Sequence, residues 1–392
     1  MNSATVNKSY YPALDGLRGL AILLVLCCHH FRFIPFFEFG WVGVDLFFVL
    51  SGFLITDILL KTKGNKNFLS NFYTRRIIRI FPLYYGALLL FFFVAPLLLS
   101  LAVQYNYYQS NQAMSWLHLQ NWLYIFHKKP NDFLLLNHFW SLSVEEQFYL
   151  VWPFFILAVK SHKRLAQVAC LILAACILSR FASWFYLGNG YTNFYFQYMT
   201  RLDGLCIGSL VAIWRFSVYK QTKKKLFKLI SILSGAHLIT LVFAKTIFTG
   251  LPHFQFFGYS TIAGIGGLII YFAVEKRNAW TRVLIENSPL TYMGKISYGL
   301  YVYHWPVLVL LKIYFMESLV SIGYSRYTSN VILSLAGLTL TVTLSVLSYH
   351  LFEKKILALK DVITEAGFLA RVRRKLLLLL KPAASSRSSG SV

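Results

Sequence analysis

Titratable side chains interrupt the first two long apolar segments of this chain, residues 13–34 and 41–60. Arg18 and His29 lie in the first segment, and Asp45 lies in the second. Ionisable groups in hydrocarbon are costly and are rarely kept without a use, so such a cluster is a functional hypothesis by default. An imidazole near a carboxylate suits acid–base chemistry, and a guanidinium suits the binding of phosphate. These residue types therefore predict a polar site within the apolar part of the molecule.

The spacing of Arg18 and His29 places both side chains on one face of a helix. Their separation of 11 residues (29 minus 18) returns almost to the starting direction at about 100° per residue, and spans about 16 Å along the axis. His30 points about 100° away from this face. A lone histidine in a membrane is often a packing residue, but an arginine on the same face weakens that interpretation. His29 is therefore a candidate catalytic residue.

Asp45 and Ser51 are polar residues of the second apolar segment. Asp45 could hold the His29 ring in one tautomer, as orienting carboxylates do, or it could form an ion pair with an arginine. The sequence does not separate these two interpretations. Glycines in the same segment permit neighbouring helices to approach closely: Gly40, Gly43 and Gly52.

An arginine cluster stands just before the third apolar segment, in the stretch FYTRRIIRIF: Arg75, Arg76 and Arg79. Arg75 and Arg79 are about one helical turn apart. Such a group of guanidinium side chains suits a polyphosphate ligand that arrives from the cytoplasm. Anchoring at the cytoplasmic membrane surface would explain one or two of the arginines equally well. Both interpretations stay open.

Adjacent glutamates, Glu145 and Glu146, follow Trp140 at the outer end of the fourth apolar segment. Carboxylates near a helix start could reflect only a favourable interaction with the helix dipole. A carboxylate shielded by aromatic side chains could instead act as acid or base. We treat Glu145 and Glu146 as candidate catalytic residues and Trp140 as a candidate substrate-binding residue.

Later segments carry further polar residues. The stretch RLDGLCIGSL places Arg201 and Asp203 at the outer end of the sixth apolar segment, as a structural ion pair or as a sugar-binding pair. The stretch GKISYGLYVYHWP places His304 in the middle of the ninth, beside Trp305 and Pro306, where the ring and freed backbone could line a cavity. Arg201, Asp203 and His304 are therefore candidate substrate-binding residues.

The composition assigns the chain to the helical membrane proteins. Of its 392 residues, 57% are hydrophobic and only 13% are charged, which is about half the charged share of a soluble domain. The net charge of +24 does not indicate nucleic acid, because the basic residues cluster in short loops between apolar segments. The cysteines lie in apolar stretches without metal-ligand spacing. We therefore expect no metal and no nucleic-acid partner.

Ten apolar segments approach the length of about 20 residues that a membrane crossing needs: residues 13–34, 41–60, 80–103, 139–159, 165–187, 199–215, 228–248, 255–274, 294–315 and 328–351. Strongly basic loops alternate with weakly basic ones only if the more polar stretch 115–126 does not cross. That stretch is then a short re-entrant or interfacial helix on the outer side, and both termini are cytoplasmic.

We thus predict an all-α polytopic bundle over residues 1–352, followed by a basic cytoplasmic tail, residues 353–392. The tail is expected to form an amphipathic helix on membrane lipids and then a disordered end. The N-terminus lacks a cleavable signal, so the first span stays. The topology places four arginines on the cytoplasmic side, Arg18, Arg75, Arg76 and Arg79, and six candidates toward the outside: His29, Asp45, Glu145, Glu146, Arg201 and Asp203. This polarity suits a donor and an acceptor on opposite faces, and it also suits a transporter.

Six sequence motifs, in the same order along the chain, resemble those of membrane-bound acyltransferase family 3. These are bacterial O-acyltransferases that modify O-antigen, peptidoglycan and exopolysaccharides. The motifs run in order from about residue 10 to 352: YYPALDGLRGLAILLVLCCHH, GWVGVDLFFVLSGFLIT, YTRRIIRIFPLYY, FWSLSVEEQFYLVWP, RLDGLCIGSL and GKISYGLYVYHWP. Some members add an SGNH hydrolase-like domain after the last span. This chain ends in a short tail, so either the membrane domain acylates its acceptor directly or a separate protein completes the transfer. We expect direct transfer.

The resemblance implies transfer of an acyl group, most simply acetyl, from cytoplasmic acyl-CoA to a hydroxyl of an extracytoplasmic glycan or lipid-linked glycan, such as lipopolysaccharide O-antigen. It implies an inner-membrane location in a bacterium and acetyl-CoA as donor. The residues assigned to the donor are Arg18, Ser51, Arg75, Arg76 and Arg79. Those assigned to catalysis are His29, Asp45, Glu145 and Glu146, with Glu146 preferred as acid or base. His29 could be a general base or could briefly carry the acyl group.

A membrane transporter or flippase for a glycan or anionic solute is the main alternative from another class. Transporters often show inverted repeats or broken helices in matching positions, and none is detected in the sequence. An inert membrane subunit that docks partners through its tail is a further alternative, against which the intact histidine and glutamate motifs argue.

Overall fold

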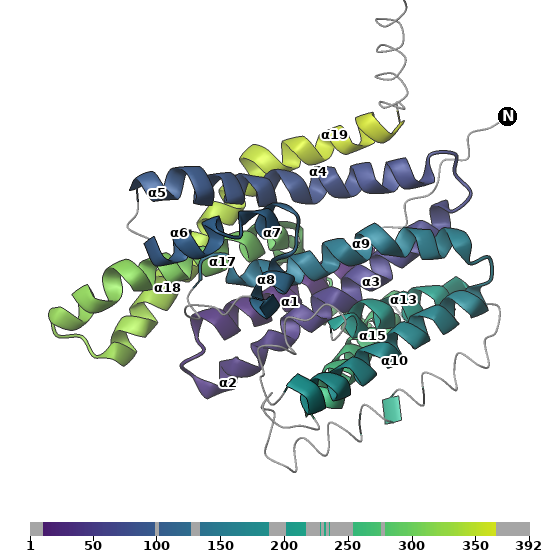
Figure 1. The fold of residues 1–392 in the computed structure, drawn as a ribbon, viewed down its shortest axis with the longest axis horizontal. Helices are drawn as coiled ribbons and strands as arrows, with labels where there is room; N and C mark the ends of the chain where they lie inside the picture. Colours follow the sequence, from purple (N-terminus) through teal and green to yellow (C-terminus); the bar gives the residue numbers. More distant parts are fainter. Residues whose placement is uncertain are drawn as a thin grey trace, which may run out of the picture.

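The computed structural model of this chain describes residues 11–98, 102–126, 134–187, 201–216, 254–275 and 279–365, with residues 228, 231, 232 and 235. All regular elements in these ranges are helices, which confirms the predicted all-α class (Figure 1). A helix satisfies its internal backbone N–H and C=O groups within one segment. Such an apolar chain therefore folds into helices rather than open sheets.

The described residues contain 7 helices long and apolar enough to cross a membrane. They are built on α1 (Pro12–His30), α3 (Val42–Thr62), α4 (Phe68–Leu89), α10 (His162–Leu187), α15 (Tyr259–Glu275), α17 (Ser288–Ser321) and α18 (Arg326–Ser348). The predicted segments 139–159 and 199–215 correspond to α9 (Trp140–Ala158) and α13 (Asp203–Phe216). The segment 228–248 lies largely outside the described residues, so the total of ten spans stays a prediction.

Short helical pieces extend several of these helices. They are α2 (Pro35–Glu38) and η1 (Phe39–Trp41) before α3, η2 (Leu90–Val94) and α5 (Ala95–Leu98) after α4, η3 (Asn137–Phe139) before α9, η4 (Phe254–Gly258) before α15, α16 (Ala279–Leu284) before α17, and η5 (Tyr349–Glu353) and α19 (Lys354–Glu365) after α18. Helix α19 runs beside α4 (Figure 1). The rest of the predicted tail, residues 366–392, lies outside the described residues.

Helices α1 and α3 form the centre of the packing: α1 contacts α17 and α3, and α3 also runs along α13. Glycine is required where α3 and α13 meet. A Cβ atom at Gly52 would lie 2.0 Å from the carbonyl oxygen of Leu205, and one at Gly208 would lie 2.0 Å from that of Val49. Gly52 therefore permits the close helix approach that its sequence position predicts.

The stretch between α5 and α9 folds into α6 (Ala102–Gln109), α7 (Gln112–Trp116) and α8 (Gln120–Phe126). Each is far shorter than the roughly 20 residues of a membrane crossing. Helix α7 contacts α4, and α8 contacts α9. The predicted stretch 115–126 thus contains the end of α7, a turn and the whole of α8, as expected for a segment that does not cross.

Candidate functional site

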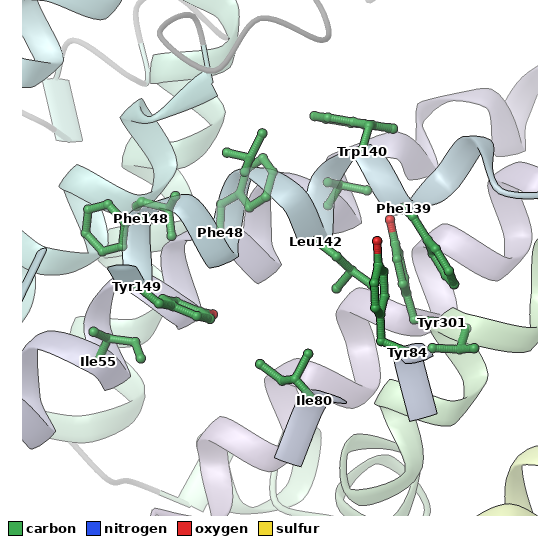
Figure 2. Close-up of a cluster of buried hydrophobic side chains, with 14 of the residues drawn as sticks. Phe48, Ile55, Ile80, Tyr84, Phe139, Trp140, Leu142, Phe148, Tyr149 and Tyr301 are labelled. Carbon is green, nitrogen blue, oxygen red and sulfur yellow. The ribbon is translucent and has the colours of Figure 1, made fainter. Parts of the chain in front are cut away.

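A cavity of about 90 Å³ lies between α1, α3, α4, α9 and α17. Its apolar wall includes Phe48, Ile80 and Leu142, and tyrosines are also among its lining residues. Figure 2 shows the ring of Tyr149 on one side of this space and that of Tyr301 on the other. The remaining lining residues carry the polar chemistry and come from segments far apart in the sequence.

One end of the cavity is cationic and is lined by Arg18, Arg76 and Arg79. Arg18 comes from α1 and forms an ion pair of 2.9 Å with Asp15, one turn earlier. Arg76 lies over the ring of Tyr149, 5.2 Å from its centroid. The structure therefore joins the arginine of the first span to two of the arginines before the third. Arg75 is not among the lining residues that the structure describes.

A carboxylate lies beside this cationic end. Ser51 on α3 donates a 2.7 Å hydrogen bond to Oε1 of Glu145 on α9, and both residues line the cavity. Glu146, the next residue along α9, points about 100° away and does not line the cavity in the described part of the chain. The geometry therefore favours Glu145 as the candidate acid or base, whereas the sequence interpretation preferred Glu146.

Hydroxyl groups form the opposite end of the cavity. Ser141 on α9 and Tyr301 on α17 both line it, and their oxygen atoms are 2.5 Å apart. The Tyr301 hydroxyl also donates to the carbonyl oxygen of His138, at 2.8 Å. The Tyr301 ring lies 5.4 Å from that of His304, less than one helical turn further along α17, but no histidine is among the described residues that line the cavity.

The histidine cluster consists of His29 on α1, His304 on α17 and His138 on η3. Nδ1 of His29 is 2.7 Å from Nε2 of His304. Trp305 packs edge-on against His29 at 4.9 Å between ring centroids, and His138 lies 5.2 Å from His304. His304 is fully buried, whereas His29 is half-buried. Of these rings, His29 is therefore the one a second reactant could reach.

Hydrogen bonds determine which nitrogen of His29 carries the proton when the rings are neutral. Nδ1 of His304 is 2.7 Å from the carbonyl oxygen of Tyr301, which can only accept, so this nitrogen is the donor. Nε2 of His304 is then an acceptor, and Nδ1 of His29 must donate to it. The lone pair of His29 consequently resides on Nε2. His304 thus orients His29, which is the role the sequence offered to Asp45.

Asp45 lies in a different buried network. It forms an ion pair of 2.8 Å with Arg201, and both side chains are 0% exposed. Of the two interpretations of Asp45, the structure thus shows the ion pair with an arginine. The hydrogen bond to the His29 ring comes from His304 instead. Arg201 also lies over the ring of Tyr259, 4.1 Å from its centroid. Asp203 forms a buried ion pair with Arg180 on α10.

Trp140 belongs to the same region rather than to the cavity. Its ring packs edge-on against Phe48 at 6.1 Å, and Arg201 lies 5.8 Å from its centroid. The buried network joins α3, α9, α10, α13 and α15, and its contacts are those of a structural core. The proposed substrate contacts of Trp140, Arg201 and Asp203 therefore have no support from the cavity's geometry.

Sequence reasoning missed three residues that the structure places at these sites: His138, Arg180 and Tyr301. Arg180 carried a usable signal, because it is a charged residue inside the fifth apolar segment. His138 directly precedes the FWSLSVEE stretch, yet nothing in its spacing linked it to His304. In the described residues, no group of three or more His, Cys, Asp or Glu side chains is placed to hold a metal ion.

The long apolar helices and the polar cavity between helices α1, α3, α4, α9 and α17 are those of a membrane protein with a buried polar site. The family profile described as an acyltransferase domain, that of acyltransferase family 3, matches residues 11–350. The chain belongs to this family.

Curated relatives agree with this assignment. YrhL of Bacillus subtilis, named as a candidate peptidoglycan O-acetyltransferase, is 31% identical over 91% of this chain and 56% of its own length. The peptidoglycan O-acetyltransferase OatA of Listeria monocytogenes is 31% identical over 78% of this chain and 50% of its own length. A Staphylococcus aureus relative, named as a candidate O-acetyltransferase, is 28% identical over 88% and 57%. The chain thus spans about half the length of these relatives. No solved structure matches it.

Proposed function

We propose that this chain transfers an acetyl group from acetyl-CoA to a hydroxyl of a cell-surface glycan. The observation that carries the proposal is a cavity with guanidinium groups at one end and Tyr301, whose ring lies 5.4 Å from that of His304, at the other. Family membership supports acyl transfer over solute transport for this arrangement. The relatives' names support a glycan such as peptidoglycan as acceptor.

The cationic end would hold the donor. Arg18, Arg76 and Arg79 suit the phosphates of CoA, since guanidinium groups bind phosphate through paired, charge-assisted hydrogen bonds. The cavity of about 90 Å³ is small beside the roughly 300–1,000 Å³ of pockets that enclose a whole ligand. The nucleotide would therefore stay at the arginines, while the thioester end of the pantetheine arm enters. The arginines face the cytoplasm in this proposal, and the histidines face the outer side.

His29 would act as the general base. Its Nε2 lone pair takes the proton of the sugar hydroxyl while the hydroxyl oxygen attacks the thioester carbonyl carbon. The new C–O bond forms, the C–S bond breaks, and the CoA thiolate recovers a proton from the imidazolium. His304 keeps the ring in the required tautomer through its 2.7 Å hydrogen bond. The same lone pair would be the nucleophile if His29 carried the acyl group between two half-reactions.

Oriented vesicles test the proposed function. Acetyl-CoA labelled in its acetyl group is supplied to the cytoplasmic face of inside-out vesicles that hold the full chain and cell-wall glycan in the lumen. We expect label on the lumenal glycan only when the protein is present. Flux of an anionic solute without labelled glycan would instead favour a transporter and contradict the proposal.

Among the arginines before the third span, substitution of one that lines the cavity should raise the KM for acetyl-CoA more than substitution of one that does not. Arg79→Gln removes a cavity arginine and is expected to raise KM for acetyl-CoA by about tenfold or more, since hydrogen bonds to charged groups contribute about 1.5–3 kcal/mol. Arg75→Gln is the matched control on the same helix, with an expected change of about twofold or less. Initial rates against acetyl-CoA concentration give both values. Equal effects of the two substitutions would contradict the assigned donor end.

A further inference from the structure

The ring of Phe47 on α3 is open to the cavity. Over residues 43–57 of α3, the side chains that are not fully buried are those of Phe47, Ser51 and Leu54, and all three line the cavity. They are spaced by four and then three residues, which places them on one face of the helix. The exposed part of the Phe47 ring therefore borders the cavity and not the outer surface of the protein.

Phe47 differs in this respect from its apolar neighbours in the cavity wall. Phe48, for example, is 1% exposed and packs edge-on against Trp140 at 6.1 Å between ring centroids. The other apolar lining residues on this side of Ser51 are also buried in the core: Val44, Ile80 and Leu142. Phe47 is thus the apolar side chain that a ligand in this part of the cavity would meet first.

Contacts between helices give the order of the groups along the cavity. Ser51 bonds to Glu145 at one level. At a second level, the Phe47 ring meets the Tyr301 ring edge-on at 6.3 Å, and Tyr301 bonds to Ser141. Phe47 precedes Ser51 by four residues on α3, and Ser141 precedes Glu145 by four residues on α9. The two levels are therefore about 6 Å apart, or one helical turn.

The arginines lie on the other side of the Glu145 level. Arg76 lies over the ring of Tyr149, 5.2 Å from its centroid. Tyr149 follows Glu145 by about one turn of α9, in the direction away from Ser141. Figure 2 shows the rings of Tyr149 and Tyr301 on opposite sides of this space. A molecule that enters from the arginines thus passes Glu145 before it reaches Phe47.

The volume of the cavity limits what can lie beyond Glu145. The cavity measures about 90 Å³, less than the roughly 150 Å³ of an apolar protein cavity that binds benzene. The thioester group of a bound donor must share this space with the acyl chain. Only a short acyl chain therefore fits, and the Phe47 ring occupies the place into which further methylene groups would extend.

We propose that Phe47 determines the acyl-length specificity of this chain: its ring ends the acyl site at the level of Tyr301, so that acetyl is accepted and butyryl and longer groups are excluded. The inference rests on the proposed function for the entry of the donor from the arginine end. It assigns Phe47 to the selection of the donor and not to the reaction itself, because a phenyl ring exchanges no proton and forms no bond to the acyl carbon.

Acyl-CoA donors of different length test this proposal on the full chain in vesicles, with cell-wall glycan as acceptor. The measured quantity is the ratio of kcat/KM for acetyl-CoA to kcat/KM for butyryl-CoA, each labelled in its acyl group. One methylene in an apolar pocket changes such a ratio by about 10–200-fold, so the wild type should prefer acetyl by about 100-fold or more. Phe47→Ala should lower the ratio by about tenfold or more, because it makes room for the butyryl chain.

A second variant and a control separate donor selection from folding. Phe47→Leu keeps an apolar side chain and perturbs the packing less, and it should lower the preference for acetyl-CoA over propionyl-CoA. Phe81→Ala removes a half-buried ring on α4, beside Ile80, that is not among the described residues lining the cavity. It should leave the wild-type ratio unchanged. A loss of folded protein lowers transfer from both donors equally and does not alter the ratio.

Butyryl transfer by the wild type that equals or exceeds acetyl transfer would overturn the role of Phe47, and so would a wild-type ratio in both Phe47 variants. Absence of transfer from every acyl-CoA would contradict the proposed function, and binding in lipid nanodiscs would then decide about Phe47. A lower Kd for acetyl-CoA than for butyryl-CoA that Phe47→Ala equalises would support the proposal. Equal Kd values in the wild type, or no binding of either donor, would overturn it.

Discussion

Replacing His29 by alanine is expected to reduce acetyl transfer to glycan by a factor of about 100 to 10,000, the usual contribution of a positioned general base. The substitution removes the only ring in the cluster that is more than marginally exposed among the described residues. His304 would lose its 2.7 Å partner but would keep its contact with the Tyr301 carbonyl. The rate of label transfer from acetyl-CoA to glycan measures the effect.

A histidine remote from the cluster supplies the control for this prediction. His350→Ala removes an exposed ring whose described hydrogen-bond partner is the Tyr292 hydroxyl, at 3.2 Å. It should leave the rate near that of the wild type. Membrane insertion of His29→Ala should also match the wild type, because the cavity arginines and the buried ion pairs stay intact. Full activity of His29→Ala would contradict a catalytic role for this residue.

Replacing Asp45 by asparagine is expected to lower the free energy of unfolding by about 3–5 kcal/mol, because it removes one partner of a fully buried ion pair with Arg201. Both side chains are 0% exposed, and the pair links α3 to Arg201, two residues before the start of α13. Unfolding in denaturant, followed by circular dichroism in detergent, measures the change. Removing both charges, in Asp45→Asn with Arg201→Gln, should recover part of the loss.

An exposed ion pair provides the comparison. Glu317→Gln breaks the pair with Arg326, whose side chains are 74% and 70% exposed, and should change stability by about 0.5 kcal/mol or less. If Asp45→Asn abolished acetyl transfer while stability stayed at the wild-type level, the structural role of Asp45 would be wrong. A catalytic role would then replace it.

The local features of this chain were accessible to sequence reasoning because helical periodicity is local. The same-face placement of Arg18 and His29 follows from 3.6 residues per turn once the segment is a helix, and α1 is one continuous helix over both. The lack of a membrane-length helix at residues 115–126 followed from composition and loop charge. Arg76 and Arg79 were predicted as phosphate-binding candidates, although not as part of one cavity with Ser51 and Glu145.

Which side chains of different helices contact one another could not be predicted from the sequence. Asp45 has the chemistry to pair with either a histidine or an arginine, and only the packing of α3 against α13 selects Arg201. Glu145 and Glu146 are chemically identical neighbours, and the rotation of α9 decides which one meets Ser51. His138 and His304 are 166 residues apart (304 minus 138), and no spacing rule connects them.

The sequence by itself thus determined the membrane class, the family resemblance and which side chains of one helix share a face. Those properties depend on composition, motif order and the geometry of a single helix. Only the tertiary structure decided that His304, not Asp45, orients His29, and that Glu145 faces the arginines. Such pairings depend on the rotation and depth of each helix relative to its neighbours. Those are set by the fit of many side chains and glycines across the interfaces, which no local pattern encodes.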